Sequence, residues 1–157
     1  MGGNGARSAF MAKTLDSYRG VRFNELNQID GVKVVAASTQ KNTAVPVESF
    51  TSNMYYVANP RTKAIDHITF YDKNGDIKHS IDLEFNNDGS LKHYKEFEKK
   101  GIVKTEGSHF HRYWPQDDLG NKRRTSHDKN NIEPINRYYM RFVNKAIEYN
   151  QKLHKNE

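Results

Sequence analysis

The feature that most constrains the fold is a two-residue alternation of apolar and polar side chains on both sides of two glycine turns. The turns are Asn74-Gly75 and Asp88-Gly89, within residues 64–97. A period of two is typical of a strand with one buried face, and Asn-Gly or Asp-Gly between such strands favours a hairpin. We therefore expect a three-stranded antiparallel meander. Its middle strand has Ile77, His79, Ile81, Leu83 and Phe85 on one face and Lys78, Ser80, Asp82 and Glu84 on the other, and its third strand holds Leu91, His93, Lys95 and Phe97.

Shorter signals predict further strands before the meander. Apolar residues at 21–26 and 32–36 flank Asp30-Gly31, which indicates another hairpin, and residues 54–58 read Met-Tyr-Tyr-Val-Ala, which favours a strand. Residues 37–53 between them are mostly polar and are expected to form a loop.

The C-terminal segment has a different period. After Pro134, a residue suited to the first turn of a helix, apolar residues recur at spacings of three and four. We expect the Tyr138, Phe142 and Ile147 side of this helix to be buried against the sheet. The predicted fold class is α+β, an antiparallel hairpin or meander sheet packed against a long C-terminal amphipathic helix. The apolar stripe comprises Ile135, Tyr138, Tyr139, Phe142, Val143, Ala146 and Ile147.

Length and composition favour one domain. With 157 residues the chain is long enough for a single core and short for two, and 8 Phe and 9 Tyr supply large side chains. Residues 1–9 contain three glycines and are expected to form a flexible arm, followed by a single domain over 10–157. The chain has no cysteine, which excludes disulfides and cysteine-based zinc sites. No apolar run approaches the ~20 residues that span a bilayer, and no signal peptide is apparent, so no membrane partner is expected.

The net charge of +6 favours a polyanionic partner such as RNA or another nucleic acid, because lysine and arginine displace counterions from phosphates. A basic surface without any such partner is the alternative.

The segment at 107–127 holds the densest set of reactive side chains. His109 and His111 share one face of an extended backbone, so one imidazole can act as base and the other as acid on a phosphodiester, with no cofactor or metal. Arg112 and Tyr113 follow directly, and with His127 they are further catalytic candidates. We assign nucleic-acid binding to Trp114, which can stack on a base, and to the cations Lys122, Arg123 and Arg124.

Two other interpretations of this segment stay open. His-x-His on a strand is also a common pair of metal ligands, with Asp117, Asp118 or His127 as the residues that complete the site. In the second interpretation, the two histidines are hydrogen-bonded structural residues. His79 and His93 are expected in the core, and His67 and His154 are given no role. The chain has no GxSxG motif, P-loop or GxGxxG motif.

The order of the motifs resembles a known group of proteins. A glycine-rich arm precedes Phe-Tyr-Asp-Lys-Asn-Gly-Asp-Ile-Lys-His-Ser-Ile-Asp-Leu at 70–83, and a His-x-His segment follows. Over about residues 65–115 this order is similar to the C-terminal modules of bacterial polymorphic toxins and of related phage head-associated proteins. The resemblance implies a nuclease, often an RNase, with His109 and His111 at its active centre.

Two functional hypotheses follow. The first is an RNA-cleaving toxin or effector domain that uses metal-independent histidine acid/base catalysis in the cytoplasm of a bacterial cell, with a cognate immunity protein as a partner. It reaches that cell as a delivered effector or inside a phage particle. The alternative is a non-catalytic phage or mobile-element particle protein that binds nucleic acid or another phage structural protein.

Overall fold

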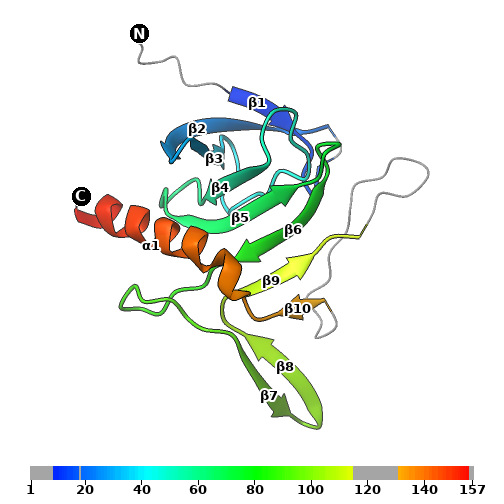
Figure 1. Ribbon diagram of the computed structural model, residues 1–157, viewed down its shortest axis with the longest axis vertical. Helices are drawn as coiled ribbons and strands as arrows, with labels where there is room; N and C mark the ends of the chain where they lie inside the picture. Colours follow the sequence, from blue (N-terminus) through cyan, green and yellow to red (C-terminus); the bar gives the residue numbers. More distant parts are fainter. Residues whose placement is uncertain (1–8, 18, 115–130, 156–157) are drawn as a thin grey trace.

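The computed structural model describes residues 9–17, 19–114 and 131–155 of the chain (Figure 1). Within these ranges the fold is mixed α/β, mostly sheet, with one helix at the C-terminal end. No helix in the described ranges is long and apolar enough to cross a membrane.

One large sheet dominates the fold. It has eight strands in the order β1-β2-β3-β4-β5-β6-β9-β10, and all neighbours are antiparallel except the parallel pair β3–β4. A separate hairpin of β7 and β8 projects away from it (Figure 1). The strands are β1 (Ala9–Ala12), β2 (Val21–Ile29), β3 (Val32–Ala37), β4 (Met54–Ala58), β5 (Ile65–Tyr71), β6 (Ile77–Asp82), β7 (Lys95–Lys99), β8 (Ile102–Glu106), β9 (His109–Arg112) and β10 (Ile132–Glu133).

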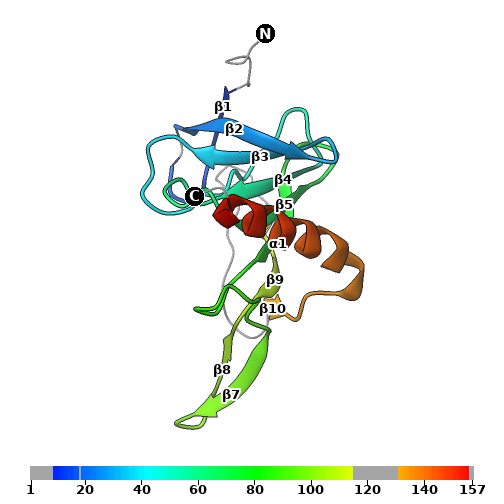
Figure 2. The ribbon, with the colours of Figure 1, turned by 90° about the vertical axis from the view of Figure 1, so that its left-hand side faces the viewer.

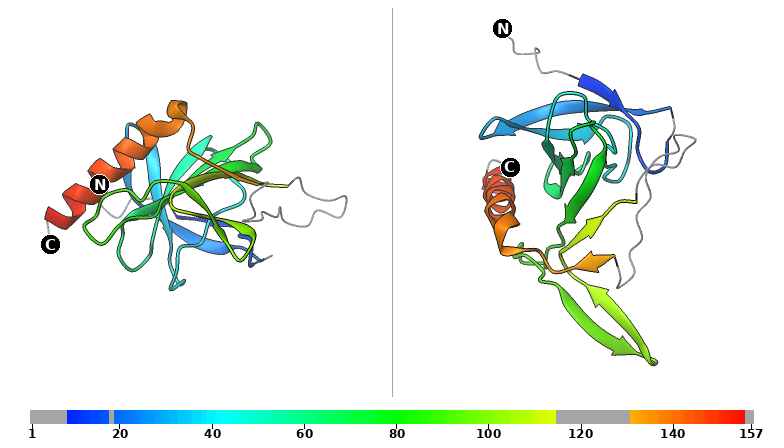
Figure 3. Two further views of the ribbon diagram at one scale, coloured as in Figure 1. Left: turned by 90° about the horizontal axis from the view of Figure 1, so that it is seen from below. Right: turned by 45° about the vertical axis from the view of Figure 1, so that its right-hand side comes forward.

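The two faces of the large sheet bury different apolar clusters. The helix α1 (Met140–Lys155) lies across one face (Figure 2). Its Val143 and Ala146 join the first cluster, whose sheet residues include Ile65, Ile68 and Phe70. The views in Figure 3 show the helix on the same side of the sheet from two further directions. The second cluster lies on the face away from α1 and includes Phe23, Tyr55, Val57, Tyr71 and Tyr113.

The helix begins later than the sequence pattern predicts. After Pro134 the chain passes through a short 3-10 helix, η2 (Arg137–Tyr139), in which the Asn136 side chain accepts a hydrogen bond from the Tyr138 N–H. This cap fixes the helical start after Asn136, so the expected start at Pro134 is wrong. Tyr138 is 61% exposed, which corrects its predicted burial, whereas Phe142 and Ile147 are partly buried against the first cluster. The buried residues of α1 are Val143, Ala146 and Asn150.

Asn150 ties the helix to the sheet. Its side-chain amide donates to the Ile65 carbonyl at 2.9 Å and its carbonyl oxygen accepts from the Ile65 N–H at 2.8 Å. The two residues are 85 positions apart in the sequence, and both are buried. This pair of bonds fixes the C-terminal half of α1 against β5.

The first half of the predicted meander is confirmed. Strands β5 and β6 pair antiparallel, and the chain reverses between them at Gly75, which has φ of 85°. The Asp72 side chain accepts hydrogen bonds from the N–H groups of Asn74 and Asp76, which closes the turn. A Cβ at Gly75 would lie 2.2 Å from the Ser49 carbonyl oxygen. Both the positive φ and this close contact therefore require glycine here. The strands predicted around Asp30-Gly31 and at 54–58 are also present.

The second half of the meander is different. The chain does reverse at Asp88-Gly89, but only an isolated bridge joins Phe85 to Leu91, and β7 pairs with β8 instead of β6. The place beside β6 belongs to β9. Ser108, just before β9, bonds to both backbone groups of Glu84 and thereby guides β9 into that place.

Two smaller predictions also change. His93 is exposed, so its predicted place in the core is wrong, whereas His79 is partly buried between the rings of Phe70 and Phe110, as expected. Ala9, the last residue of the predicted arm, belongs to β1; residues 1–8 lie outside the described ranges.

Candidate active site

The register of β5, β6 and β9 brings polar side chains into two rows across the sheet. His67 lies opposite Asp82, and Asp82 lies opposite His109. In the next row Ser80 lies between Thr69 and His111. Side chains two residues apart on a strand share a face, so both rows lie on the face away from α1, beside the cluster that includes Tyr71 and Tyr113.

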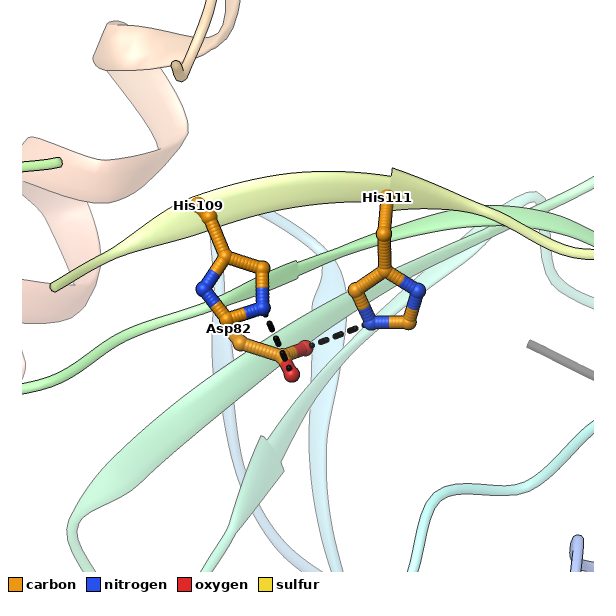
Figure 4. Close-up of side chains that lie close together, drawn as sticks. All are labelled: Asp82, His109 and His111. Carbon is orange, nitrogen blue, oxygen red and sulfur yellow. Dashed lines mark hydrogen bonds and ion pairs between the residues drawn. The ribbon is translucent and has the colours of Figure 1, made fainter. Parts of the chain in front are cut away.

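Three imidazole rings surround the carboxylate of Asp82. The Nε2 atom of His111 lies 3.0 Å from Oδ1, that of His109 lies 3.4 Å from Oδ2, and that of His67 lies 3.5 Å from Oδ1. Figure 4 shows His109 and His111 side by side on β9 with Asp82 below them. Their ring centroids are 5.6 Å apart, which confirms the prediction that these two histidines share one face.

The Nδ1 atoms of two rings have their own partners. Nδ1 of His67 lies 2.9 Å from the Asp66 carboxylate, and Nδ1 of His109 lies 2.9 Å from the Gly107 carbonyl oxygen. Asp66 reaches this face because the register shift between Val57 and Ala58 makes it the extra residue of a bulge. Acceptors at both Nδ1 atoms keep a proton there and direct each Nε2 toward Asp82.

Hydroxyl groups complete the network at both ends. Thr43 donates to the second oxygen of Asp66 at 2.7 Å, which holds that carboxylate beside His67. At the opposite end Ser80 Oγ lies 2.9 Å from His111 Nε2 and 3.4 Å from the Tyr113 hydroxyl. The network of polar contacts therefore extends from Thr43, across β5, β6 and β9, to Tyr113.

The carboxylates favour protonated histidines. Burial alone would lower the pKa of His67, but the negative charges of Asp82 and Asp66 outweigh it and raise the pKa above its ordinary value. Burial likewise opposes protonation of His109, and its hydrogen bonds to Asp82 and to the Gly107 carbonyl outweigh that effect, so its pKa is also raised. Burial raises the pKa of Tyr113, which keeps its hydroxyl protonated.

A pocket opens over this network. Its volume is about 520 Å³, and His67, Asp82, His111 and Tyr113 form one wall. Both His67 and His111 border the pocket, but the side chain of His111 is only 2% exposed, whereas that of His67 is 23% exposed. The other walls come from residues 14–16 and 39–45.

The structure separates the other predicted site residues. Arg112 lies on the opposite face of β9 from the histidines, where its guanidinium bonds to Glu133 at 3.1 Å and stacks over the Phe110 ring. Tyr113 is in the pocket wall, and Trp114 is 57% exposed. Lys122, Arg123, Arg124 and His127 lie outside the described residues, as do Asp117 and Asp118.

Sequence reasoning missed Asp82, Ser80 and His67. The alternation on the middle strand did place Ser80 and Asp82 on one face, and the same period on β5 applies to His67. The missing information was the pairing of β9 with β6, because the strand pattern does not specify a partner so distant in the sequence.

Comparison of the chain with protein-family models, curated proteins and solved structures found no match.

Proposed function

We propose that this chain cleaves RNA by metal-independent acid/base catalysis, with the imidazoles around Asp82 as the proton carriers. The observation that supports the proposal is the convergence of three histidine rings on one carboxylate in a pocket wall. Cleavage at a 2′-hydroxyl requires a base for the hydroxyl proton, an acid for the leaving 5′-oxygen and positive charge near the phosphorane. Histidine supplies all three near neutral pH.

His111 is suited to the role of base. Its Nε2 lies within hydrogen-bond distance of Asp82 and of Ser80, and these partners hold the ring proton on that nitrogen. The neutral ring then has its lone pair on Nδ1, which points away from Asp82 (Figure 4). A carboxylate that fixes the tautomer of a histidine base in this way is a recurring arrangement in acyl-transfer and hydrolytic enzymes.

His67 is suited to the role of acid. It lies in the pocket wall, and the carboxylates on both sides of its ring favour the protonated form. His109 adjoins the same carboxylate with a raised pKa and adds positive charge to stabilise the transition state. The catalytic set that we propose therefore adds His67 and Asp82 to the two histidines of β9.

The preference for RNA rests on charge and on the surroundings of the pocket. The net charge of +6 attracts a polyanion, and the exposed Lys41 is part of the pocket wall. Thr39, Asn42 and Thr43 add side chains that can bond to phosphate or ribose. The exposed indole of Trp114, the residue after Tyr113, can stack on a base.

The resemblance of residues 65–115 to polymorphic-toxin and phage head-associated modules supports a biological role. We propose action in the cytoplasm of a bacterial cell, where a toxin of this kind would require an immunity protein. That protein is expected to cover the pocket formed by His67, Asp82 and His111.

The test uses purified full-length chain with a labelled RNA and with DNA of the same sequence, each in EDTA. Cleavage of the RNA alone, with 2′,3′-cyclic phosphate ends, is expected because DNA lacks the attacking hydroxyl. His67→Gln and His111→Gln should each reduce the rate by a factor of ~100 or more, the typical contribution of an acid or base. His93→Gln, at an exposed site away from the network, is the matched control.

Three outcomes contradict the proposal. RNA that stays intact in EDTA and also in Mg²⁺ or Mn²⁺ would exclude cleavage, and binding without cleavage would favour the non-catalytic particle protein. Cleavage that EDTA abolishes would show that the chemistry depends on a metal ion.

A further inference from the structure

We infer that Asp82, His109 and His111, with His67 beside them, form a binding site for one divalent transition-metal ion of the zinc type. This inference goes beyond the proposed cleavage reaction, which uses no metal. Among the described residues, one ligand atom from each of Asp82, His109 and His111 lies within 4.8 Å of the other two.

The distances around Asp82 fit such an ion. Zinc in proteins has bonds of about 2.0–2.1 Å to histidine nitrogen and carboxylate oxygen, so the ligand atoms of a tetrahedral site lie roughly 3.3–3.4 Å apart. Oδ1 of Asp82 lies 3.0 Å from Nε2 of His111 and 3.5 Å from Nε2 of His67, and Oδ2 lies 3.4 Å from Nε2 of His109. The carboxylate and each imidazole are therefore already spaced as neighbouring ligands.

The outer hydrogen bonds give an independent reason. A histidine that binds a metal through Nε2 almost always donates its Nδ1–H to a carboxylate or a backbone carbonyl, which fixes the ring. His67 has the Asp66 carboxylate at 2.9 Å from Nδ1, and His109 has the Gly107 carbonyl at 2.9 Å. Both rings therefore direct Nε2 at the place where a cation would lie, between the histidines and Asp82.

The ligand chemistry selects the class of ion. Imidazole nitrogen binds zinc, copper, nickel and iron well, whereas Mg²⁺ and Ca²⁺ prefer sites made of oxygen atoms. Two imidazoles with one carboxylate, and a third imidazole beside that carboxylate, correspond to the first class. The adjoining pocket of about 520 Å³ leaves space for water or a small ligand on the ion.

A proton and a metal ion would then compete for the same Nε2 atoms. A metal ion on Nε2 takes the place of the proton that His67 or His109 holds toward Asp82, so binding releases protons and strengthens as the pH rises. The metal-bound form would also lack the acid of the proposed cleavage. Zinc is therefore expected to inhibit cleavage, whereas EDTA is not.

The test measures metal binding alone, without RNA. Full-length chain stripped with EDTA is titrated with Zn²⁺ by calorimetry at pH 7.5, and Co²⁺ absorption reports the coordination. One ion per chain is expected. Asp82→Asn and His109→Gln should each weaken Zn²⁺ binding by about 100-fold or more, and Asp66→Asn by about 10-fold as an outer-shell change. His93→Gln should leave the affinity unchanged, and thermal melts establish that each variant is folded.

Undiminished Zn²⁺ binding in the folded Asp82→Asn, His109→Gln double variant would overturn the inference, as would wild-type chain that binds no Zn²⁺ at 100-fold molar excess. Neither result depends on nuclease activity. Conversely, absence of RNA cleavage leaves the binding isotherm intact, so the two proposals fail separately.

Discussion

Truncation of Asn150 tests the link between helix and sheet. Asn150→Ala removes the donor for the Ile65 carbonyl and the acceptor for the Ile65 N–H, two backbone groups of a residue with no exposed surface. An unsatisfied buried polar group costs about 1–3 kcal/mol, so the two together cost about 2–6 kcal/mol. Asn150 also borders a surface pocket, through which water can reach the truncated site. We therefore expect a loss of about 2–3 kcal/mol, toward the lower end of that range.

Urea denaturation followed by circular dichroism measures this loss, with Asn144→Ala as the control. Asn144 is an exposed residue of the same helix, and its truncation should change the free energy of unfolding by less than about 0.5 kcal/mol. A loss below about 1 kcal/mol for Asn150→Ala, with an unchanged dependence on urea, would refute the reasoning. It would mean that solvent replaces both bonds without cost and that the apolar contacts of α1 suffice to hold it.

Three further outcomes are expected. The raised pKa values of His67 and His109 mean that the folded state holds extra protons above pH 6.5, so their stabilisation is complete below that pH and is lost as the pH rises through the raised values. Asp82→Asn should flatten this decline in urea melts at pH 6–9; equal slopes in both proteins would contradict it. Gly75→Ala should destabilise by about 2 kcal/mol or more in the same assay, because the residue has positive φ and its Cβ would meet a backbone carbonyl. Reversal of the charges at 122–124 should weaken RNA binding and reduce the salt dependence of the affinity, as measured by titration over a range of salt concentrations; an unchanged salt slope would exclude phosphate contacts there.

The local pattern predicted the local structure. Alternation and turn residues located the hairpin of β5 and β6, the hairpin of β2 and β3, and the strand β4. They also placed His109 and His111 on one face, because that follows from the strand period alone. These predictions depend on residues close together in the sequence, where backbone geometry decides the outcome.

The local sequence pattern could not predict that β9 pairs with β6. A hairpin pattern suggests that the strand after Asp88-Gly89 pairs with β6. That segment forms only the isolated bridge between Phe85 and Leu91, and β9, from further along the chain, pairs with β6 instead. The choice depends on tertiary bonds such as those from Ser108 to Glu84. With β9 placed by the structure, Asp82 and His67 become evident as members of the site. The predicted helix start was wrong for a similar reason, because the Asn136 cap, and not the apolar stripe, determines where the helical segment begins.

The pairing of β6 with β9 has a consequence for the timing of folding. His111 and Asp82 are 29 positions apart in the sequence, and the β7–β8 hairpin lies between them. Contacts across such a loop form late, because the entropy cost of closing the loop comes before the stabilisation from strand pairing. A growing or unfolded chain therefore holds Asp82, His109 and His111 as separate, solvated side chains. Any reactivity of the cluster appears only when β9 docks beside β6.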